Sequence, residues 1–319
     1  MTNTLNALVH TLRYEAEATF SIELRPVDGG EFPAFEAGAH IDLHLPNGLV
    51  RSYSLLNDAR ERHRYVVAVL KDRASRGGSR YVHEQLRVGS VIKIGAPRNA
   101  FKLHEEAAHT VLVAGGIGIT PLLCMARRLR SLGRSVELLY FARTRKHAAF
   151  IDDINALGIP VHWHFDEQAG GPPDIKALLA SRAVKAQAHY YACGPAVMLD
   201  AFEKCCAELG YTQAHVERFS PVEVAAAKDA CSTYTVHLQR SGRDIVVTPE
   251  LSLLKALKAA GCNVPSSCEE GVCGACETQV LAGVPDHRDS VLSPAEKAAS
   301  KSMMICVSGC KSESLTLDI

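Results

Sequence analysis

The sequence predicts a multidomain chain that combines an antiparallel β-barrel, a parallel α/β domain and a small C-terminal β-grasp domain. Short alternating strand patterns separated by turn signals fill the first hundred residues. Strand–helix–strand alternation begins near Ala108, and a group of cysteines lies inside a strand–strand–helix–loop–helix–strand pattern near the C-terminus. We expect domains at 1–104, 105–222 and 233–319, with a linker over 223–232.

The N-terminal region has the pattern of a barrel. Residues 40–45 alternate polar and apolar, as a half-buried strand does. Pro46-Asn47-Gly48 follows as a hairpin turn, and 49–55 returns as the partner strand. Further β-rich runs cover 65–70 and 91–94. Many short strands joined by turns predict a closed or nearly closed antiparallel barrel.

Two short motifs in this region suit a ligand with a phosphate and a flat ring. Arg51-Ser52-Tyr53-Ser54 lies on a predicted strand, where alternation places Arg51 and Tyr53 on one face. A cation, an aromatic ring and a hydroxyl suit such a ligand, although an ordinary strand carries the same residues. Arg76-Gly77-Gly78-Ser79 precedes a predicted helix over 80–86. Ser79 is the expected N-cap of this helix, and the free backbone N–H groups of the first helical turn would form an anion site. A capped surface helix without a ligand is the alternative.

The middle region has the pattern of a parallel sheet covered by helices. An apolar strand over 110–114 leads into a glycine-rich turn, a helix over 121–132 and a strand over 135–141. A later strand over 188–192 is followed by a helix that Gly210 closes.

The glycine-rich turn Gly115-Gly116-Ile117-Gly118-Ile119-Thr120-Pro121 has the position of a phosphate-binding loop, because it follows a buried strand and opens a helix. It is an imperfect dinucleotide fingerprint, since Pro121 stands where the third glycine belongs, and a turn without a ligand is the alternative. Cys193-Gly194-Pro195 ends another predicted strand, at the edge of the sheet where ligands bind. The spacing alone favours Cys193 as a packed residue over a reacting one.

The C-terminal region holds the most specific motif. Cys268, Cys273 and Cys276 are spaced C-x4-C-x2-C, and Cys306 follows thirty residues later. This spacing is typical of a plant-type [2Fe–2S] cluster. A zinc site usually pairs two short C-x2-C units, and a disulfide framework belongs to small secreted chains. Cys310 competes with Cys306 as the fourth ligand, and the spacing favours Cys306.

Secondary structure around these cysteines fits a β-grasp fold. Strands over 234–238 and 244–247 form a predicted hairpin, and a helix over 252–260 ends at Gly261. Ser293-Pro294-Ala295-Glu296 is a second helix start, with proline at the first position and a capping-box glutamate.

Composition excludes several classes of protein. The chain of 319 residues has a formal net charge of zero, whereas a nucleic-acid binder normally carries a basic excess. No apolar run reaches the roughly eighteen residues of a membrane span. The eleven cysteines, with no visible signal peptide, indicate a reducing compartment, so we expect a cytoplasmic protein that engages neither nucleic acid nor membrane.

Taken together and in this order, the motifs resemble those of the phthalate dioxygenase reductase family, which includes vanillate O-demethylase reductases. The resemblance covers essentially the whole chain. It implies FMN, NADH and a [2Fe–2S] cluster as cofactors, and domain order favours FMN because the ferredoxin part comes last. The implied ligands of the cluster are Cys268, Cys273, Cys276 and Cys306.

The resemblance also implies roles for the other motif residues. Arg51 contacts the flavin phosphate, Tyr53 lies against the isoalloxazine ring, and Ser54 bonds near the flavin N5. Cys193 lies near the nicotinamide, which favours function over packing there, and Phe219 lies beside the flavin. The glycine-rich motifs supply Gly77, Gly78 and Ser79 for the FMN phosphate and Gly116, Gly118 and Thr120 for the nicotinamide cofactor.

The function that the resemblance implies is electron transfer from NADH through FMN and the cluster to a terminal Rieske-type oxygenase that acts on an aromatic acid. We expect the oxygenase to bind this chain only transiently. A stand-alone NADH reductase of quinones or ferric chelates and a non-enzymatic iron–sulfur protein are the alternatives.

The choice of NADH over NADPH rests on the resemblance. Arg143 and Arg145 follow a sheet strand and suit the 2′-phosphate of NADPH, although solvated surface charge is the favoured interpretation.

Overall fold

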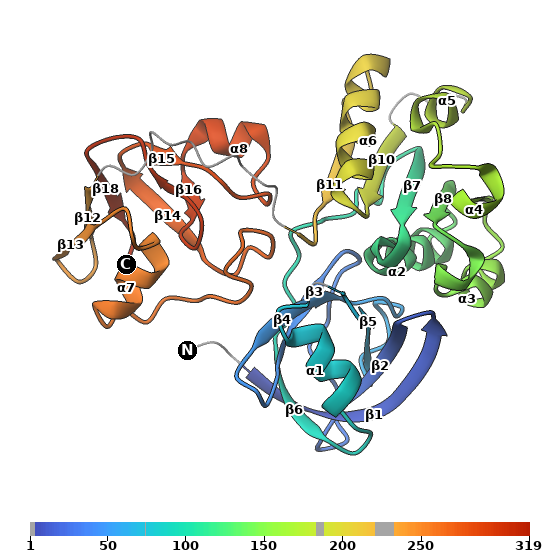
Figure 1. The fold of residues 1–319 in the computed structure, drawn as a ribbon, viewed down its shortest axis with the longest axis horizontal. Helices are drawn as coiled ribbons and strands as arrows, with labels where there is room; N and C mark the ends of the chain where they lie inside the picture. The colour runs from blue at the N-terminus through green and yellow to red at the C-terminus, as the bar shows by residue number, and fades with distance from the viewer. Residues whose placement is uncertain (1–3, 74, 183–187, 221–232) are drawn as a thin grey trace. The chain divides into compact units, whose positions relative to one another are not determined.

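A computed structural model describes residues 4–73, 75–182, 188–220 and 233–319 of the chain (Figure 1). The chain forms two compact units, 1–219 and 220–319. The predicted linker over 223–232 lies outside the described residues. Over the part that the structure describes, no helix has the length and apolar character that a membrane crossing requires.

The first unit begins with an antiparallel sheet that closes on itself. Its strand order is β4-β3-β6-β1-β2-β5, and the two ends of that order, β4 and β5, lie against each other. Alternating side chains fill the interior, where Ile22, Leu24, Ile41 and Ile94 are fully buried. The predicted barrel is therefore present. Its strands are β1 (Thr4–Ala16), β2 (Thr19–Pro26), β3 (His40–His44), β4 (Val50–Ser54), β5 (Tyr65–Leu70) and β6 (Val91–Gly95).

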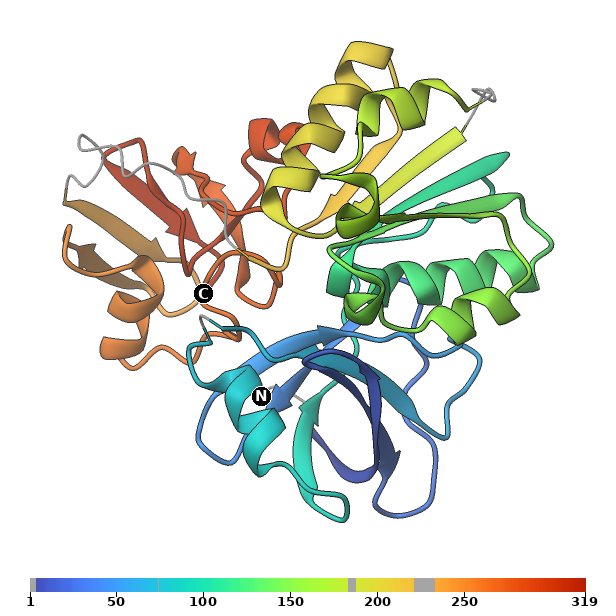
Figure 2. The same cartoon turned by 45° about the vertical axis from the view of Figure 1, so that its right-hand side comes forward.

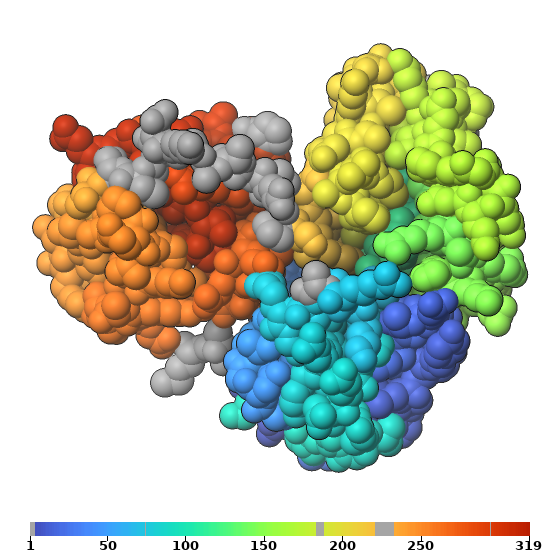
Figure 3. All heavy atoms as spheres, in the orientation of Figure 1, coloured from blue at the N-terminus to red at the C-terminus, as the bar shows by residue number. Residues whose placement is uncertain are grey.

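One helix, α1 (Gly78–Gln85), packs on the outside of this barrel, as the space-filling view shows (Figure 3). Val82 is buried against the barrel, whereas Arg80 and Glu84 are exposed. The helix begins two residues earlier than the sequence predicts. Gly77, with φ 95°, is its N-cap, so the prediction that Ser79 caps it is wrong. A left-handed glycine turns the chain into the helix, and Ser79 falls in the first turn.

The rest of the first unit is a five-stranded parallel sheet of order β11-β10-β7-β8-β9. α2 and α3 cover one face, and α5 and α6 cover the other (Figure 2). Alternation along β7 sends Leu112 to the first face and Val111 to the second, as strand geometry requires. The strands are β7 (His109–Gly115), β8 (Val136–Ala142), β9 (Val161–Phe165), β10 (Ala188–Cys193) and β11 (Ala214–Glu217). The helices are η1 (Gly116–Gly118), α2 (Ile119–Ser131), η2 (Arg145–His147), α3 (Ile151–Ala156), α4 (Asp166–Ala169), α5 (Ile175–Ala180) and α6 (Ala196–Leu209).

The second unit is built on a mixed sheet of order β13-β12-β18-β14-β16. The predicted hairpin and both predicted helices are present. Ser252 caps α7, and Ser293 forms a capping box with Glu296 at the start of α8. The elements are β12 (Tyr234–Leu238), β13 (Arg243–Val247), α7 (Leu253–Ala259), β14 (Glu277–Ala282), β15 (Pro285–Asp286), α8 (Pro294–Ala299), β16 (Ser302–Met304), β17 (Gly309–Cys310) and β18 (Ser314–Leu317).

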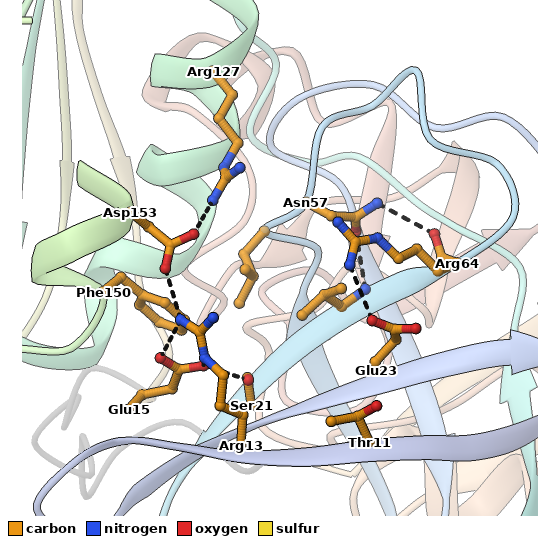
Figure 4. A pocket seen from close by; sticks show the side chains of 12 residues that line it. Thr11, Arg13, Glu15, Ser21, Glu23, Asn57, Arg64, Arg127, Phe150 and Asp153 are labelled. Carbon is orange, nitrogen blue, oxygen red and sulfur yellow. Dashed lines mark hydrogen bonds and ion pairs between the residues drawn. The ribbon is translucent and has the colours of Figure 1, made fainter. Parts of the chain in front are cut away.

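An ion-pair network joins the barrel to the parallel sheet within the first unit (Figure 4). Arg13 of β1 donates to Asp153 Oδ2 of α3 at 2.7 Å, and Arg127 of α2 donates to Asp153 Oδ1 at 2.8 Å. Glu15 accepts a second bond from Arg13 at 2.8 Å. These charges line a cavity of about 150 Å³. Because its charges are paired with one another, we interpret this cavity as a structural junction.

Replacing the shared carboxylate tests the junction. Burial opposes ionisation of Asp153, but the hydrogen bonds from Arg13 and Arg127 outweigh it, so the pKa of Asp153 is lowered. Asp153→Asn should reduce the free energy of unfolding at neutral pH by about 1–2 kcal/mol. The folded pKa lies below the unfolded value of about 3.9, so this contribution is complete above pH 4 and disappears as the pH falls through the folded pKa.

Thermal unfolding of the full chain between pH 3 and pH 7 measures this effect. The exposed Asp152→Asn, in the same turn of α3, is the matched control and should leave stability unchanged. An equal loss in both variants, or a difference that does not shrink at all between pH 7 and pH 3, would contradict the account.

Candidate functional site

The carboxyl edge of the parallel sheet is held together by a close backbone contact. Gly118 lies against the end of β10, where an added Cβ would stand 2.1 Å from the carbonyl oxygen of Cys193 and 2.7 Å from the nitrogen of Gly194. Gly118 has φ −62°, so contact rather than conformation requires glycine here. This contact fixes the glycine-rich turn beside Cys193, at the carboxyl edge where ligands of parallel α/β sheets bind.

The turn itself presents backbone to open space. Gly116 has φ 53°, and nothing lies within 4 Å of the position where its Cβ would be. A phosphate or nicotinamide group therefore has room to approach the main chain. Thr120 is buried, and its hydroxyl donates to the carbonyl of Ile117 at 3.1 Å. The side chain of Thr120 thus stabilises the turn by a hydrogen bond, whereas Gly116 and Gly118 leave space for a ligand and for a close backbone contact.

Ser54, Cys193 and Glu217 come together where the barrel meets this edge. Cys193 and Glu217 are paired neighbours at the ends of β10 and β11, and the hydroxyl of Ser54, at the end of β4, donates to the carboxyl of Glu217. Burial, and then the nearby Glu217, raise the pKa of Cys193, so its fully buried thiol stays protonated. The structure therefore brings the predicted residues Ser54 and Cys193 to one place.

Glu217 is a candidate functional residue that the sequence reasoning missed. Burial raises its pKa to about 8, against the hydrogen bond from Ser54, which lowers it. The residue as a whole is half-buried, but its Oε2 atom is buried and has no hydrogen-bond partner among the described residues. Such a carboxyl in an enclosed site is a candidate proton carrier. The only sequence signal was an acidic residue at a strand end, just before Arg218 and Phe219.

Arg51 and the start of α1 form a second part of the site. A Cβ on Gly78 would stand 2.6 Å from Arg51 Nε, so only glycine lets the guanidinium lie over the helix start. Arg51 donates to the carbonyls of Val50 at 2.8 Å and Arg76 at 3.4 Å. The structure thus gathers Arg51, Gly77 and Gly78 beside the first N–H groups of α1, an arrangement that suits a phosphate.

Two other predicted residues border this region. Burial, opposed by Arg51, raises the pKa of Tyr53 to about 12, so its phenol remains neutral. Ser79 turns toward the preceding loop, where its hydroxyl bonds to that of Ser75 at 2.9 Å and accepts from the N–H of Asp72 at 3.2 Å. Phe219 is exposed just after β11, two residues beyond Glu217.

The four predicted cluster cysteines form two pairs in the second unit. The Sγ atoms of Cys276 and Cys306 are 3.1 Å apart. A hydrogen bond to Cys273, followed by burial, raises the pKa of Cys268. Cys310 lies elsewhere, with its thiol donating to the carbonyl of Ser312 at 2.9 Å. A [2Fe–2S] cluster needs two thiolates on each iron, and two adjacent thiol pairs fit that requirement.

The loop that carries these cysteines also fits a cluster. Backbone N–H groups of Glu270 and Val272 face the sulfur of Cys268, and that of Gly271 faces Cys306. Gly271 has φ 72°, and a Cβ there would be 2.6 Å from a methyl of Val307. Main-chain N–H groups directed at sulfur stabilise negative charge, which thiolate ligands carry.

Comparisons with known proteins agree with this geometry. Residues 236–311 match the model of the 2Fe-2S iron-sulfur cluster binding domain. The phenoxybenzoate dioxygenase subunit beta of Ectopseudomonas oleovorans is 49% identical over 98% of this chain and 96% of its own. The tetrachlorobenzoquinone reductase of Sphingobium chlorophenolicum is 44% identical over the full length of both chains. The solved structure of phthalate dioxygenase reductase is 37% identical, covers 99% of this chain and 98% of its own, and superposes with a TM-score of 0.72.

Fold and site together define an oxidoreductase that uses a flavin, a nicotinamide nucleotide and a [2Fe–2S] cluster. The chain belongs to the phthalate dioxygenase reductase family.

The contact at Gly118 generates a first prediction for this site. Gly118→Ala should separate the glycine-rich turn from β10, weaken NADH binding and lower stability by about 3 kcal/mol or more, because backbone atoms must move. Fluorescence titration with NADH and thermal unfolding measure the two effects. Gly30→Ala is the control, since the nearest atom to its Cβ is the side-chain Oδ1 of Asp28 at 3.3 Å. Unchanged NADH affinity in Gly118→Ala would contradict the interpretation.

The raised pKa of Glu217 generates a second prediction. Between about pH 4.5 and pH 8 the folded chain holds a proton that the unfolded chain has lost, so the stability of the wild type should fall as pH rises across this window. Glu217→Gln is neutral throughout and should lack that decline, a difference on the order of 4 kcal/mol. Thermal unfolding from pH 5 to pH 9 checks this, with the exposed Glu167→Gln as the control. Parallel pH profiles for the wild type and Glu217→Gln would refute a buried, protonated carboxyl.

Proposed function

We propose that this chain is the reductase component of a Rieske-type oxygenase system, passing electrons from NADH through FMN and a [2Fe–2S] cluster to a terminal oxygenase that acts on an aromatic acid. The observation that carries this proposal is the presence of paired cluster cysteines on the same chain as a flavin and nucleotide site. The name of the phenoxybenzoate dioxygenase subunit supports the class of system.

Residues of the barrel would hold the FMN. Arg51 and the N–H groups beside Gly77, Gly78 and Ser79 suit its phosphate, and Tyr53 supplies an aromatic surface for the ring system. When bound, a flavin accepts two electrons together and releases them one at a time, which links a hydride donor to a one-electron cluster.

Residues at the sheet edge would orient the nicotinamide and hold a proton. Gly116 and Gly118 leave space beside the main chain, and the small buried thiol of Cys193 excludes water without carrying charge. Below about pH 8 the carboxyl of Glu217 carries a proton beside the hydroxyl of Ser54. We propose that this pair keeps a proton within reach of the reacting ring, because the protonated carboxyl of Glu217 can donate to Ser54 Oγ and so free the Ser54 hydroxyl hydrogen to face the ring.

In the second unit, we propose that Cys268 and Cys273 bind one iron and that Cys276 and Cys306 bind the other. The pairing of the thiols supports this division, and the bond from Cys310 to Ser312 argues against Cys310 as a ligand. We also propose domain boundaries at 1–104, 105–222 and 233–319, which agree with a sheet that ends at β6 and another that begins at β7. A transient encounter with the oxygenase in the cytoplasm, where thiols stay reduced, completes the proposal.

A second candidate function is direct reduction of quinones, and the 44% identity to a tetrachlorobenzoquinone reductase favours it. The two functions differ in whether electrons must leave through the cluster. A quinone accepts electrons at the flavin, whereas an oxygenase partner accepts them singly from the iron–sulfur centre.

Two cysteine variants separate these functions. Cys306→Ala should lose iron and reduce the transfer of electrons to cytochrome c and to a Rieske-type oxygenase to background, while NADH still bleaches the flavin. Cys310→Ala is the matched control, four residues away on the same segment, and should retain the iron and all activities. Visible absorbance, iron analysis and acceptor assays measure the outcome. Full oxygenase turnover in iron-free Cys306→Ala would overturn the proposal, and quinone turnover without oxygenase turnover in the wild type would favour the second function.

A further inference from the structure

Three histidines distant in sequence converge in the first unit. His189 lies on β10 and His215 on the adjacent edge strand β11, while His104 lies in the segment between β6 and β7 (Figure 1). Each offers a ring nitrogen, and the three atoms lie within 4.8 Å of one another. Within the described ranges, no other trio of His, Cys, Asp or Glu side chains meets that criterion.

The distances between the rings suit a shared ligand. His189 Nδ1 and His215 Nε2 are 3.0 Å apart. Two nitrogens bound to one tetrahedral metal at about 2.0–2.1 Å stand roughly 3.3 Å apart, so a small rotation of either ring admits an ion. The ring of His104 lies 4.7 Å from that of His189 and 5.1 Å from that of His215, measured between centroids.

Tyr191 positions two of the three imidazoles. Its ring stacks on His215 with centroids 4.5 Å apart, and its hydroxyl accepts a hydrogen bond from the backbone N–H of His104 at 2.9 Å. The same hydroxyl donates to the carbonyl of Lys102 at 3.3 Å. The loop that carries His104 is therefore anchored to β10, and Tyr191 holds the His104 segment and the His215 ring in place before any ligand binds.

The chemistry of the group also suits a metal. Burial, and then the neighbouring imidazoles His189 and His104, lower the pKa of His215 to about 4, and burial lowers that of His189. Neutral imidazole is the form that binds a metal. His104 is exposed and the other two are half-buried, so solvent reaches the group and a fourth position is available to water.

We propose that His104, His189 and His215 form a binding site for one divalent transition-metal ion of the zinc, nickel or copper type. Three neutral nitrogen ligands favour these borderline ions over Mg²⁺ and Ca²⁺, which prefer oxygen. The alternative explanation is a stack of aromatic rings without a ligand, in which a hydrogen bond joins His189 Nδ1 to His215 Nε2. Zinc binding decides between the two.

The location gives such a site a consequence. Alternation places His189 and Cys193 on one face of β10, and His215 and Glu217 on the same face of β11. Two residues of a strand span about 6.5 Å, so the ion would lie about two residues along β11 from the buried carboxyl of Glu217. It would tie the edge strand β11 to the loop at His104 and so restrain the strand that carries Glu217.

Zinc binding to the full holoprotein, loaded with flavin and cluster, tests the proposal. After equilibrium dialysis against micromolar ZnSO₄, elemental analysis should find about one zinc per chain with the iron content unchanged. His104→Asn, His189→Asn and His215→Asn should each raise the dissociation constant by at least about tenfold, since even indirect partners of a metal contribute that much. His162→Asn, a half-buried histidine of the same sheet outside the group, is the matched control.

The outcomes are decisive even when a buried variant folds poorly. Flavin and iron content report folding, and the exposed His104→Asn alone decides the question if the other two lose either cofactor. Zinc should also raise the unfolding temperature of the wild type and of His162→Asn but not of His104→Asn. No zinc bound to the wild type above the level of a dialysis blank without protein, or equal zinc affinity in the wild type and His104→Asn, would overturn the proposal.

Discussion

The contact between Gly118 and the carbonyl of Cys193 is the constraint on which the rest of the site depends. Because no Cβ fits there, the turn after β7 lies directly against the end of β10. The pairing of β10 with β11 places Cys193 beside Glu217, and Ser54 of the barrel reaches the same carboxyl. The ion pairs that Asp153 makes with Arg13 and Arg127 then hold barrel and sheet in the arrangement that this meeting requires.

Burial gives this meeting point its chemistry. A carboxyl that loses water holds its proton more tightly, and a thiol under the same conditions stays neutral. Cys193 and Glu217 therefore form an uncharged patch at neutral pH, which suits the approach of a flat nicotinamide ring. In the second unit, the neighbouring cysteines and burial raise the pKa of Cys268 and Cys306, while backbone N–H groups directed at their sulfurs act in the other direction and favour negative charge. One chain thus provides separate environments for hydride chemistry and for a one-electron centre.

Much of this could be predicted from the sequence, because local patterns encode it. The hairpin at Pro46-Asn47-Gly48, the capping box at Ser293 and the alternation of strands all follow from short-range chemistry. The long strands β1 and β2 were missed, since register shifts near Val9 and Tyr14 break their alternation. The cap at Ser79 was wrong because a left-handed Gly77 starts the helix first. Glu217 and the three histidines could not be found, because burial and convergence of residues distant in sequence exist only in the fold.

The central claim is that this chain converts the electron pair of NADH into single electrons, and a reductive titration tests it most directly. Anaerobic addition of NADH to the holoprotein should deliver about three electrons per chain, two to the flavin and one to the cluster. Flavin absorbance and the electron paramagnetic resonance signal of reduced [2Fe–2S] should both follow the titration. Uptake that stops at two electrons, with the iron still oxidised when dithionite can reduce it, would contradict the account.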